Sequence, residues 1–160
     1  MREIGLTRGF VAFVDDEDYE KVNRHSWCAI QGGGYRKKTY AQSNIKVNGI
    51  WKRVLMHRFI LNPLPDQLID HEDGNGLNCV KSNLRIATRG QNQHNSGPRK
   101  GRSAFKGVSW SKSANKWIAQ ICKDGKRRYL GLFVEEEDAA KAYDDAAKGL
   151  HGEFAKTNFR

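Results

Sequence analysis

Four side chains in the middle of the chain are of types that hydrolyse phosphodiester bonds with the help of a metal ion. Asp70 and His71 are adjacent, and Asn83 and Asn92 follow the histidine by twelve and twenty-one positions. A neutral histidine can act as a general base near pH 7. Carboxylate and amide oxygens are ligands that Mg²⁺ and Mn²⁺ accept. The group therefore indicates a metal-dependent hydrolytic site, provided that the fold brings these residues together.

Short elements must position this group. Residues 68–71 and 84–86 have the pattern of two strands, and the Asp, Asn and Gly residues at 73–76 favour a turn between them. Thr88 and Gln91 have the spacing of a capping box, so a short helix is expected to follow and to carry the second asparagine in its first turns.

The same stretch resembles the HNH endonucleases, in particular those related to homing enzymes. The resemblance rests on MHRFIL at 56–61, IDHEDGNGLN at 69–78 and SNLRIATRGQN at 82–92, and it spans roughly residues 50 to 96. Several polar residues spaced within an apolar frame make it more specific than a lone Asp-His pair. It implies that the two strands and the helix form a ββα-metal fold.

The resemblance also implies a role for each residue. Asp70 and Asn92 would bind one Mg²⁺, or Mn²⁺ in its place, and His71 would deprotonate the attacking water. Asn83 would hold the loop between the strands by hydrogen bonds. Many family members carry histidine at the position of Asn92, and the nearby His94 and Asn95 leave the second ligand open.

Each of these residues also has an ordinary structural explanation. Asp, Asn and Gly gather in turns for conformational reasons, and a capping box does no more than start a helix. For one residue alone that explanation is preferred, whereas the whole constellation in register favours the nuclease interpretation.

The C-terminal third, from about Ser103 to Phe159, predicts three strands and one helix. Alternation at 117–122 gives a strand with one packed face, Asp124-Gly125 suits a two-residue hairpin turn, and apolar residues recur at helical spacing between 135 and 150. Acidic residues gather on that helix and basic residues on the linker and strands. The exposed sheet face is therefore expected to meet phosphate.

This segment is similar to the Apetala and ethylene-response-factor (ERF) DNA-binding domain over its whole length. In that family the sheet lies in the DNA major groove. By position, the expected contacts are Lys106, Ser109, Trp110, Lys116, Gln120, Arg127 and Tyr129. Several arginines expected from the family are replaced, as at Ser109 and Cys122, so its guanine-rich target is not carried over. Trp117, Phe105 and Phe133 are expected in the core. For Trp110 and Tyr129, a place in the core and a contact with DNA are equally consistent with the sequence.

The remaining segments are less specific. Residues 1–54 have the pattern of a small antiparallel sheet, divided by Gly32-Gly33-Gly34 and Asn48-Gly49, and its role could be support or further DNA contact. His57-Arg58 lies in an expected short helix, from which Arg58 is a candidate phosphate contact. The linker at 97–102 adds Arg99, Lys100 and Arg102 as candidate DNA contacts.

Composition agrees with a nucleic-acid partner. The chain has 160 residues and a net charge of +10, which attracts polyanions. Cys28, Cys79 and Cys122 are isolated, so neither a disulfide framework nor a structural zinc is expected. No apolar run is long enough to span a membrane and no secretory signal is recognised, so a soluble, intracellular protein is expected.

Taken together, the sequence predicts an α+β protein with an N-terminal β-rich region (1–54), a nuclease module (55–96), a basic linker (97–102) and an ERF-type domain (103–160). The expected function is metal-dependent cleavage of double-stranded DNA by nicking, with the C-terminal sheet selecting the target and the protein acting as a monomer or weak dimer. The alternative is a DNA-binding transcriptional regulator with an inactive HNH module. Binding of structured RNA is a third class.

Overall fold

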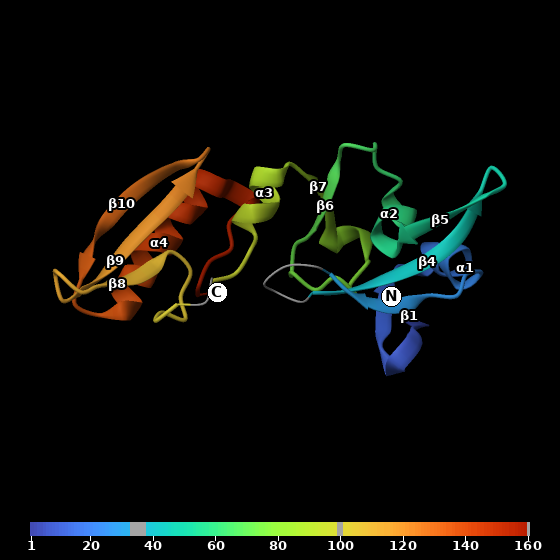
Figure 1. Ribbon diagram of the computed structural model, residues 1–160, viewed down its shortest axis with the longest axis horizontal. Coiled ribbons are helices and arrows are strands. Elements are labelled where there is room, and N and C mark those ends of the chain that lie inside the picture. Colours follow the sequence, from blue (N-terminus) through green and yellow to red (C-terminus); the bar gives the residue numbers. More distant parts are fainter. Residues whose placement is uncertain (33–37, 99–100, 160) are drawn as a thin grey trace. The chain divides into compact units, whose positions relative to one another are not determined.

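The structure is a computed structural model that describes residues 1–32, 38–98 and 101–159 (Figure 1). It contains two compact units, residues 1–88 and 89–160. Small antiparallel sheets and a three-stranded sheet packed on one helix confirm the predicted α+β class. The division falls between Thr88 and Arg89, whereas the sequence predicted module boundaries after residues 54 and 96. Predictions for Gly33, Gly34, Arg99 and Lys100 lie outside the described residues.

The first unit begins with two small sheets. Their elements are β1 (Arg2–Gly5), the 3-10 helix η1 (Thr7–Gly9), β2 (Val11–Val14), α1 (Asp16–Asn23), β3 (Cys28–Gln31), β4 (Thr39–Val47) and β5 (Ile50–Leu55). β1 pairs with β2, and β3, β4 and β5 form an antiparallel sheet in that order. The predicted turn at Asn48-Gly49 is confirmed, with φ of 51° and 81°. The N-terminal region thus holds two sheets where one was predicted, because β1 gave no recognisable pattern in the sequence.

The predicted strand, loop and strand follow the expected short helix. The elements are α2 (Met56–Leu61), β6 (Leu68–His71), the 3-10 helix η2 (Lys81–Asn83) and β7 (Leu84–Ala87). β6 and β7 are antiparallel, with Ile69 opposite Ile86. The segment 72–83 that joins them, called the finger loop below, contains turns, η2 and an isolated bridge from Asn78 to Phe13.

One hydrophobic core holds the first unit together. Val14 of β2, Val22 of α1 and Met56 of α2 are fully buried within it, and Ile69 of β6 and Leu84 of β7 belong to the same cluster. Burial of such side chains contributes about 1.5–3 kcal/mol each. The strand that carries Asp70 and His71, and its partner β7, are therefore packed on the same core as the N-terminal sheets.

The second unit contains the predicted three strands and helix. Its elements are α3 (Arg89–His94), β8 (Val108–Ser111), β9 (Lys116–Lys123), β10 (Lys126–Phe133), α4 (Glu136–His151) and the 3-10 helix η3 (Gly152–Phe154). The strands are antiparallel in the order β10, β9, β8. Asp124 and Gly125 form the predicted turn with φ of 52° and 75°. Trp117, Phe105 and Phe133 pack on the core, as predicted.

Alanines let α4 lie close to the sheet. Ala139, Ala140 and Ala147 are fully buried, and Tyr143 packs with Ile121 of β9. Ala142, Ala146 and Leu150 are partly buried and pack against the same clusters. The predicted apolar spacing of this helix is therefore confirmed.

A buried carboxylate closes the C-terminal end of this unit. Asp144 of α4 accepts hydrogen bonds from the backbone N–H groups of Asn158 and Phe159 and from the side-chain amide of Asn158, at 2.8–3.0 Å. The side chain of Asn158 in turn bonds the backbone of Lys106 on both its N–H and carbonyl. The last residues are thus tied to the segment before β8.

Candidate active site and nucleic-acid interface

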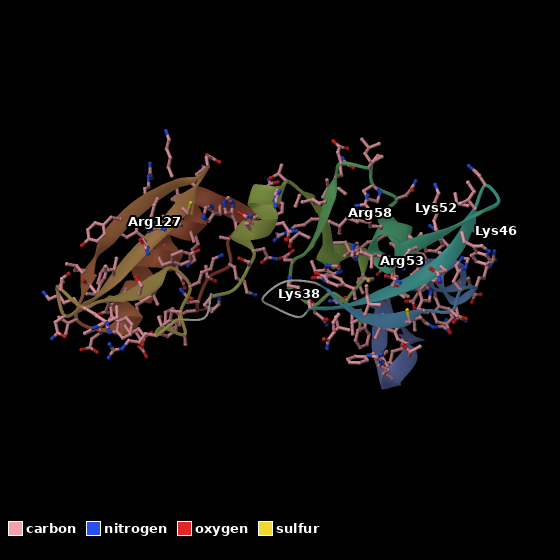
Figure 2. All side chains as sticks on the ribbon, in the orientation of Figure 1. Lys38, Lys46, Lys52, Arg53, Arg58 and Arg127 are labelled. Carbon is pink, nitrogen blue, oxygen red and sulfur yellow. The ribbon has the colours of Figure 1, made fainter. Side chains whose placement is uncertain are left out.

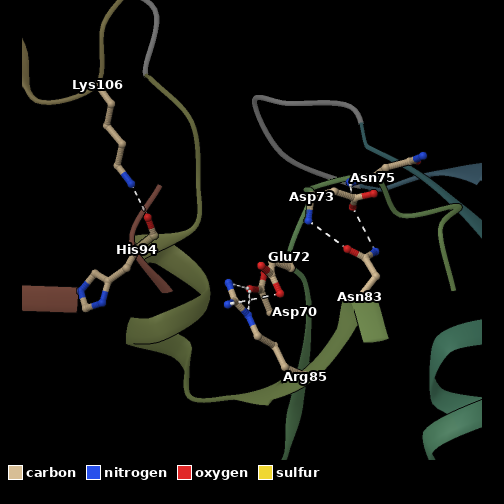
Figure 3. Close-up of polar contacts among 8 residues, drawn as sticks. All are labelled: Asp70, Glu72, Asp73, Asn75, Asn83, Arg85, His94 and Lys106. Carbon is tan, nitrogen blue, oxygen red and sulfur yellow. Dashed lines mark hydrogen bonds and ion pairs between the residues drawn. The ribbon is translucent and has the colours of Figure 1, made fainter. Parts of the chain in front are cut away.

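Asp70 and His71 end β6 and are both buried, with 2% and 4% of their surface exposed. Asp70 lies opposite Arg85 of β7 in the strand register. The guanidinium of Arg85 donates to Oδ2 of Asp70 from Nε at 3.0 Å and from Nη2 at 2.8 Å (Figure 3). A buried carboxylate needs such a partner, because desolvation of an uncompensated charge costs several kcal/mol. Glu72 lies 4.0 Å from the same guanidinium.

The ring of His71 lies in a small aromatic cluster. Its centroid is 4.9 Å from that of His57 in an edge-on arrangement and 6.0 Å from that of Tyr40. Burial, and then the charge of Lys38, lower the pKa of His71 to about 4, against the opposing effect of Asp73 and Asp70. Burial also lowers the pKa of His57 to about 3. Both rings are therefore neutral at pH 7, the form in which an imidazole accepts a proton.

Sequence reasoning did not single out Tyr40 as part of this cluster. It lies 31 positions before His71, and no local motif connects the two. Its ring also explains one glycine of the finger loop: a Cβ on Gly76 would lie 2.6 Å from the Tyr40 ring and 2.5 Å from the carbonyl oxygen of Thr39. Only glycine permits this close approach of the loop to β4.

Hydrogen bonds among Asp and Asn side chains define the finger loop. Asn83 accepts from the N–H of Asp73 at 3.0 Å and donates through Nδ2 to Asp73 Oδ1 and to the carbonyl of Asn78. Asp73 also accepts from the N–H of Asn75 and from Nδ2 of Asn78. Burial opposes ionisation of Asp73, but these bonds and the nearby His71 together lower its pKa. Asn83 thus holds the loop, which is the role expected of it; any part in the chemistry stays a prediction.

Residues of β2 and of the segment around α1 also hold the finger loop. Phe13 of β2 donates to the carbonyl of Leu77 at 2.9 Å and accepts from the N–H of Cys79 at 2.8 Å. Lys81 donates its backbone N–H to Asp15 at 2.7 Å, and its ammonium pairs with Asp18 at 2.9 Å. The N-terminal region therefore supports the candidate site directly.

Asn92, the predicted second metal ligand, lies in α3 and therefore in the second unit, whereas Asp70 lies in the first. The end of α3 is fixed within its own unit: the ammonium of Lys106 donates to the carbonyl of His94 (Figure 3), and the rings of His94 and His151 stack at 3.7 Å. Asn95 is buried. These contacts give His94 a structural role, and Asn92 as the second ligand stays a prediction.

The donor types at Asp70 and Asn92 fit a hard cation such as Mg²⁺. Within the described residues, no group of three or more His, Cys, Asp or Glu side chains is arranged to hold a metal. The carboxylate of Asp70 can accept from Arg85 on one oxygen and still have lone pairs for a cation, since a carboxylate offers about four acceptor positions.

The face of the second unit's sheet turned away from α4, called the outer face below, carries five of the expected contacts. Strand alternation and register place Ser109, Gln120, Arg127 and Tyr129 on it, with Gln120 opposite Tyr129. Tyr129 is 62% exposed, whereas Ala119 on the opposite face is fully buried. Lys116 at the start of β9 shares the outer face. Long polar and aromatic side chains on one flat surface suit contact with DNA.

Other expected contacts have partners within the fold. Trp110 pairs with Trp117 on the helix-facing side, at 5.0 Å between ring centroids, and the guanidinium of Arg102 lies over its ring. Lys106 reaches His94, as described above. In the first unit, the guanidinium of Arg58 donates to the carbonyls of Gln67 and Leu64 and ties α2 to the following loop. A DNA-binding role for these residues stays a prediction.

Comparison with known proteins agrees with both halves of this description. Residues 103–153 match the AP2 domain model. An uncharacterized HNH endonuclease, L560 of Acanthamoeba polyphaga mimivirus, is 29% identical over 161 residues, which cover 97% of this chain and 78% of that protein. Protein 3.8 of Escherichia phage T7 is 36% identical over 96 residues, covering 59% of this chain and 78% of that protein. The chain is thus similar to an HNH endonuclease over nearly its whole length and carries an AP2 domain at residues 103–153.

The AP2 domain has relatives of a different kind. Dehydration-responsive element-binding protein 2A of Arabidopsis thaliana is 42% identical over 65 residues, which cover 39% of this chain and 19% of that protein. The predicted resemblance to both families is thus confirmed. The comparisons indicate a nuclease with a DNA-binding domain. Within the described residues, no helix is long and apolar enough to cross a membrane.

Proposed function

We propose that this protein is a metal-dependent endonuclease that hydrolyses phosphodiester bonds of double-stranded DNA by nicking. The observation that carries the proposal is the buried Asp70-His71 pair at the end of β6, with a neutral imidazole beside a carboxylate that pairs with Arg85. A general base and an oxygen ligand at adjacent positions are what hydrolysis of a phosphodiester by activated water requires.

The residues divide the work as follows. His71 accepts a proton from the attacking water, and its ring is held by His57 and Tyr40. Asp70 and, on the family resemblance, Asn92 are the proposed ligands of Mg²⁺ or Mn²⁺. When bound, the ion supplies charge stabilisation at the phosphate. Asn83 keeps the finger loop closed over this end of β6.

Recognition is assigned to the AP2 domain. The outer face, with Lys116, Gln120, Arg127 and Tyr129, is proposed to lie in the major groove, where such side chains reach both phosphates and base edges. The helix α4 begins with Glu136, and three of its first residues are acidic, so the opposite side of the domain disfavours DNA.

Conversion of supercoiled plasmid to open-circular DNA tests the proposal. The wild type is expected to nick with Mg²⁺ or Mn²⁺ and to be inactive in EDTA. His71→Ala should slow nicking by about 10²–10⁴-fold, the usual contribution of a general base, while DNA binding is retained. The matched control is His25→Ala, because His25 lies in the same unit but packs against Trp27 and Phe59. Nicking by His71→Ala at the wild-type rate would exclude His71 as the base.

A DNA-binding regulator with an inactive HNH module is the alternative function. Two observations favour it: 65 residues of the chain are 42% identical to dehydration-responsive element-binding protein 2A, and the Asp70 carboxylate already has a guanidinium partner. Binding that is equally tight with and without Mg²⁺, and no cleavage over a broad set of DNA, would establish this alternative.

A further inference from the structure

The end of the β4–β5 hairpin is a second basic surface, in a region to which the proposed function gives only a supporting role. β4 and β5 pair in register, with Asn44 opposite Arg53 and Lys46 opposite Trp51. Cross-strand partners project from the same face of a sheet, so these four side chains form one face of the hairpin. They are all exposed, and Figure 2 shows Lys46, Lys52 and Arg53 along this hairpin. Residues 44–53 are called the arm below.

The arm is firmly held at its base. Ala41 and Ile45 of β4 are buried in the core of the first unit, and the hydroxyl of Ser43 donates to the carbonyl of Ser26 at 2.7 Å. At the other end, the two-residue turn at Asn48-Gly49 closes the hairpin tightly. The arm therefore presents its side chains on a rigid backbone, which lowers the entropy lost when they bind a partner.

Large apolar side chains are exposed on the arm beside its cations. Trp51 is 69% exposed and Ile50 is 64% exposed. β5 is an edge strand, and lysine on an edge strand commonly serves only to prevent unwanted pairing. That explanation does not account for an exposed tryptophan at the same place, because a solubilising edge gains nothing from it. Exposed aromatic groups next to cations suit a partner with both charge and apolar surface.

The charges in the part of the sequence that contains the arm are of one sign. From residue 21 to residue 65 the sequence contains no Asp or Glu, whereas it contains nine Lys or Arg residues. A segment of this kind attracts a polyanion. If two copies of the protein paired through β5, Lys52 and Arg53 of one copy would approach the same residues of the other copy. Repulsion between these like charges opposes such pairing. Duplex DNA offers phosphates for the cations and sugars and base edges for the aromatic ring.

We propose that the arm binds duplex DNA, with Lys46 and Arg53 on phosphates and the ring of Trp51 against the sugars or base edges of a groove. The inference rests on DNA as the partner in the proposed function and not on cleavage. It gives the protein a second DNA contact, in the unit that carries Asp70 and His71, in addition to the AP2 domain. Such a contact holds DNA without requiring a particular base sequence.

Binding to a duplex of about 30 base pairs in EDTA, measured by fluorescence anisotropy at several salt concentrations, tests the inference without cleavage. Each phosphate contact contributes about 0.9 to the slope of log affinity against log salt. The double variant Lys46→Gln and Arg53→Gln is expected to lower that slope by about two and to weaken binding at 0.1 M salt by one to two orders of magnitude. The matched control, Arg8→Gln with Lys148→Gln, removes the same charge from exposed positions elsewhere and should change the slope by less than half as much.

Acrylamide quenching of tryptophan fluorescence gives an independent test, in which the unmodified protein is compared with Trp51→Phe. Trp51 is far more exposed than the buried Trp27, so its emission is more accessible to the quencher. DNA should protect part of the emission of the unmodified protein from quenching, and this protected part should be absent in Trp51→Phe. Equal slopes for the two double variants, or quenching of Trp51 unchanged by DNA, would overturn the inference. Protection of Trp51 from acrylamide that appears without DNA and increases with protein concentration would also overturn the inference. It would mean that a second copy of the protein covers the arm. Loss of nicking with intact arm binding would count against the nuclease proposal alone.

Discussion

The candidate active site and the outer face of the AP2 domain differ in how far their side chains are exposed to solvent. Asp70 and His71 are almost completely buried and are held by cross-strand and ring contacts, whereas Tyr129 and Arg127 are exposed on a flat sheet. Burial fixes the protonation state and the geometry that a general base needs. Exposure leaves long side chains able to reach phosphates and base edges. Substitutions should therefore separate the two regions, with large effects on stability in the first and effects on affinity alone in the second.

The largest expected effect on stability comes from breaking the ion pair under the active site. Asp70→Ala would leave the guanidinium of Arg85, whose side chain is only 14% exposed, without its principal carboxylate. Removal of one partner from a buried pair costs about 3 kcal/mol or more. Chemical denaturation should therefore show a loss of about that size in the free energy of unfolding of the first unit.

Glu72→Ala is the control for this substitution. Glu72 lies near the same guanidinium, but its side chain is 63% exposed and the separation is 4.0 Å. We expect a change within about 0.5 kcal/mol, as for most exposed positions. A similar loss for both variants would show that burial of Asp70 does not set the energetics of the site.

Acid should destabilise the first unit through its buried histidines. The pKa of His57 is lowered to about 3 and that of His71 to about 4, whereas an unfolded histidine has a pKa near 6.5. Between these values the unfolded chain binds more protons than the folded unit, so stability falls as the pH drops from about 6.5 toward 4. His57→Phe should reduce this pH dependence, measured by denaturation at a series of pH values in EDTA. An unchanged pH dependence in the variant would mean that His57 is protonated as readily in the fold as in the unfolded chain.

The two regions also differ in how far the sequence alone could predict them. In the AP2 domain, alternation along β9 and the Asp124-Gly125 turn are local signals, and they predicted the strands and the hairpin correctly. In the first unit, the end of β6 and the finger loop were predicted from their local motif. The ring of Tyr40 beside His71 and the clamp of Phe13 on the finger loop were not, because both depend on contacts between distant segments.

Buried polar groups show the same limit within the AP2 domain. The sequence places acidic residues on α4, and one of them, Asp145, is exposed. Its neighbour Asp144 is buried and fastens Asn158 and Phe159. Helical periodicity indicates which positions face inward, but it does not reveal that the partner of a buried carboxylate comes from the C-terminal segment.

The smallest expected effect is on DNA affinity, and it would show whether DNA binding depends on the outer face of the AP2 sheet. Arg127 and Arg128 are adjacent and exposed, but they lie on opposite faces of the sheet. Arg127 is opposite Cys122 of β9 on the outer face, and Arg128 is opposite Ile121 on the helix-facing side. Arg127→Ala should weaken DNA binding about tenfold at 0.1 M salt and lower the salt slope by about one, as loss of one phosphate contact does.

Arg128→Ala is the matched control, because it removes the same charge from the same strand on the other side. Long-range attraction is reduced equally in both variants, so any difference between them reports contact with DNA and not net charge. Neither should change the free energy of unfolding by more than about 0.5 kcal/mol, since both side chains are exposed. Equal loss of affinity in the two variants would mean that the AP2 domain attracts DNA by its overall charge, and the outer face would lose its assigned role in recognition.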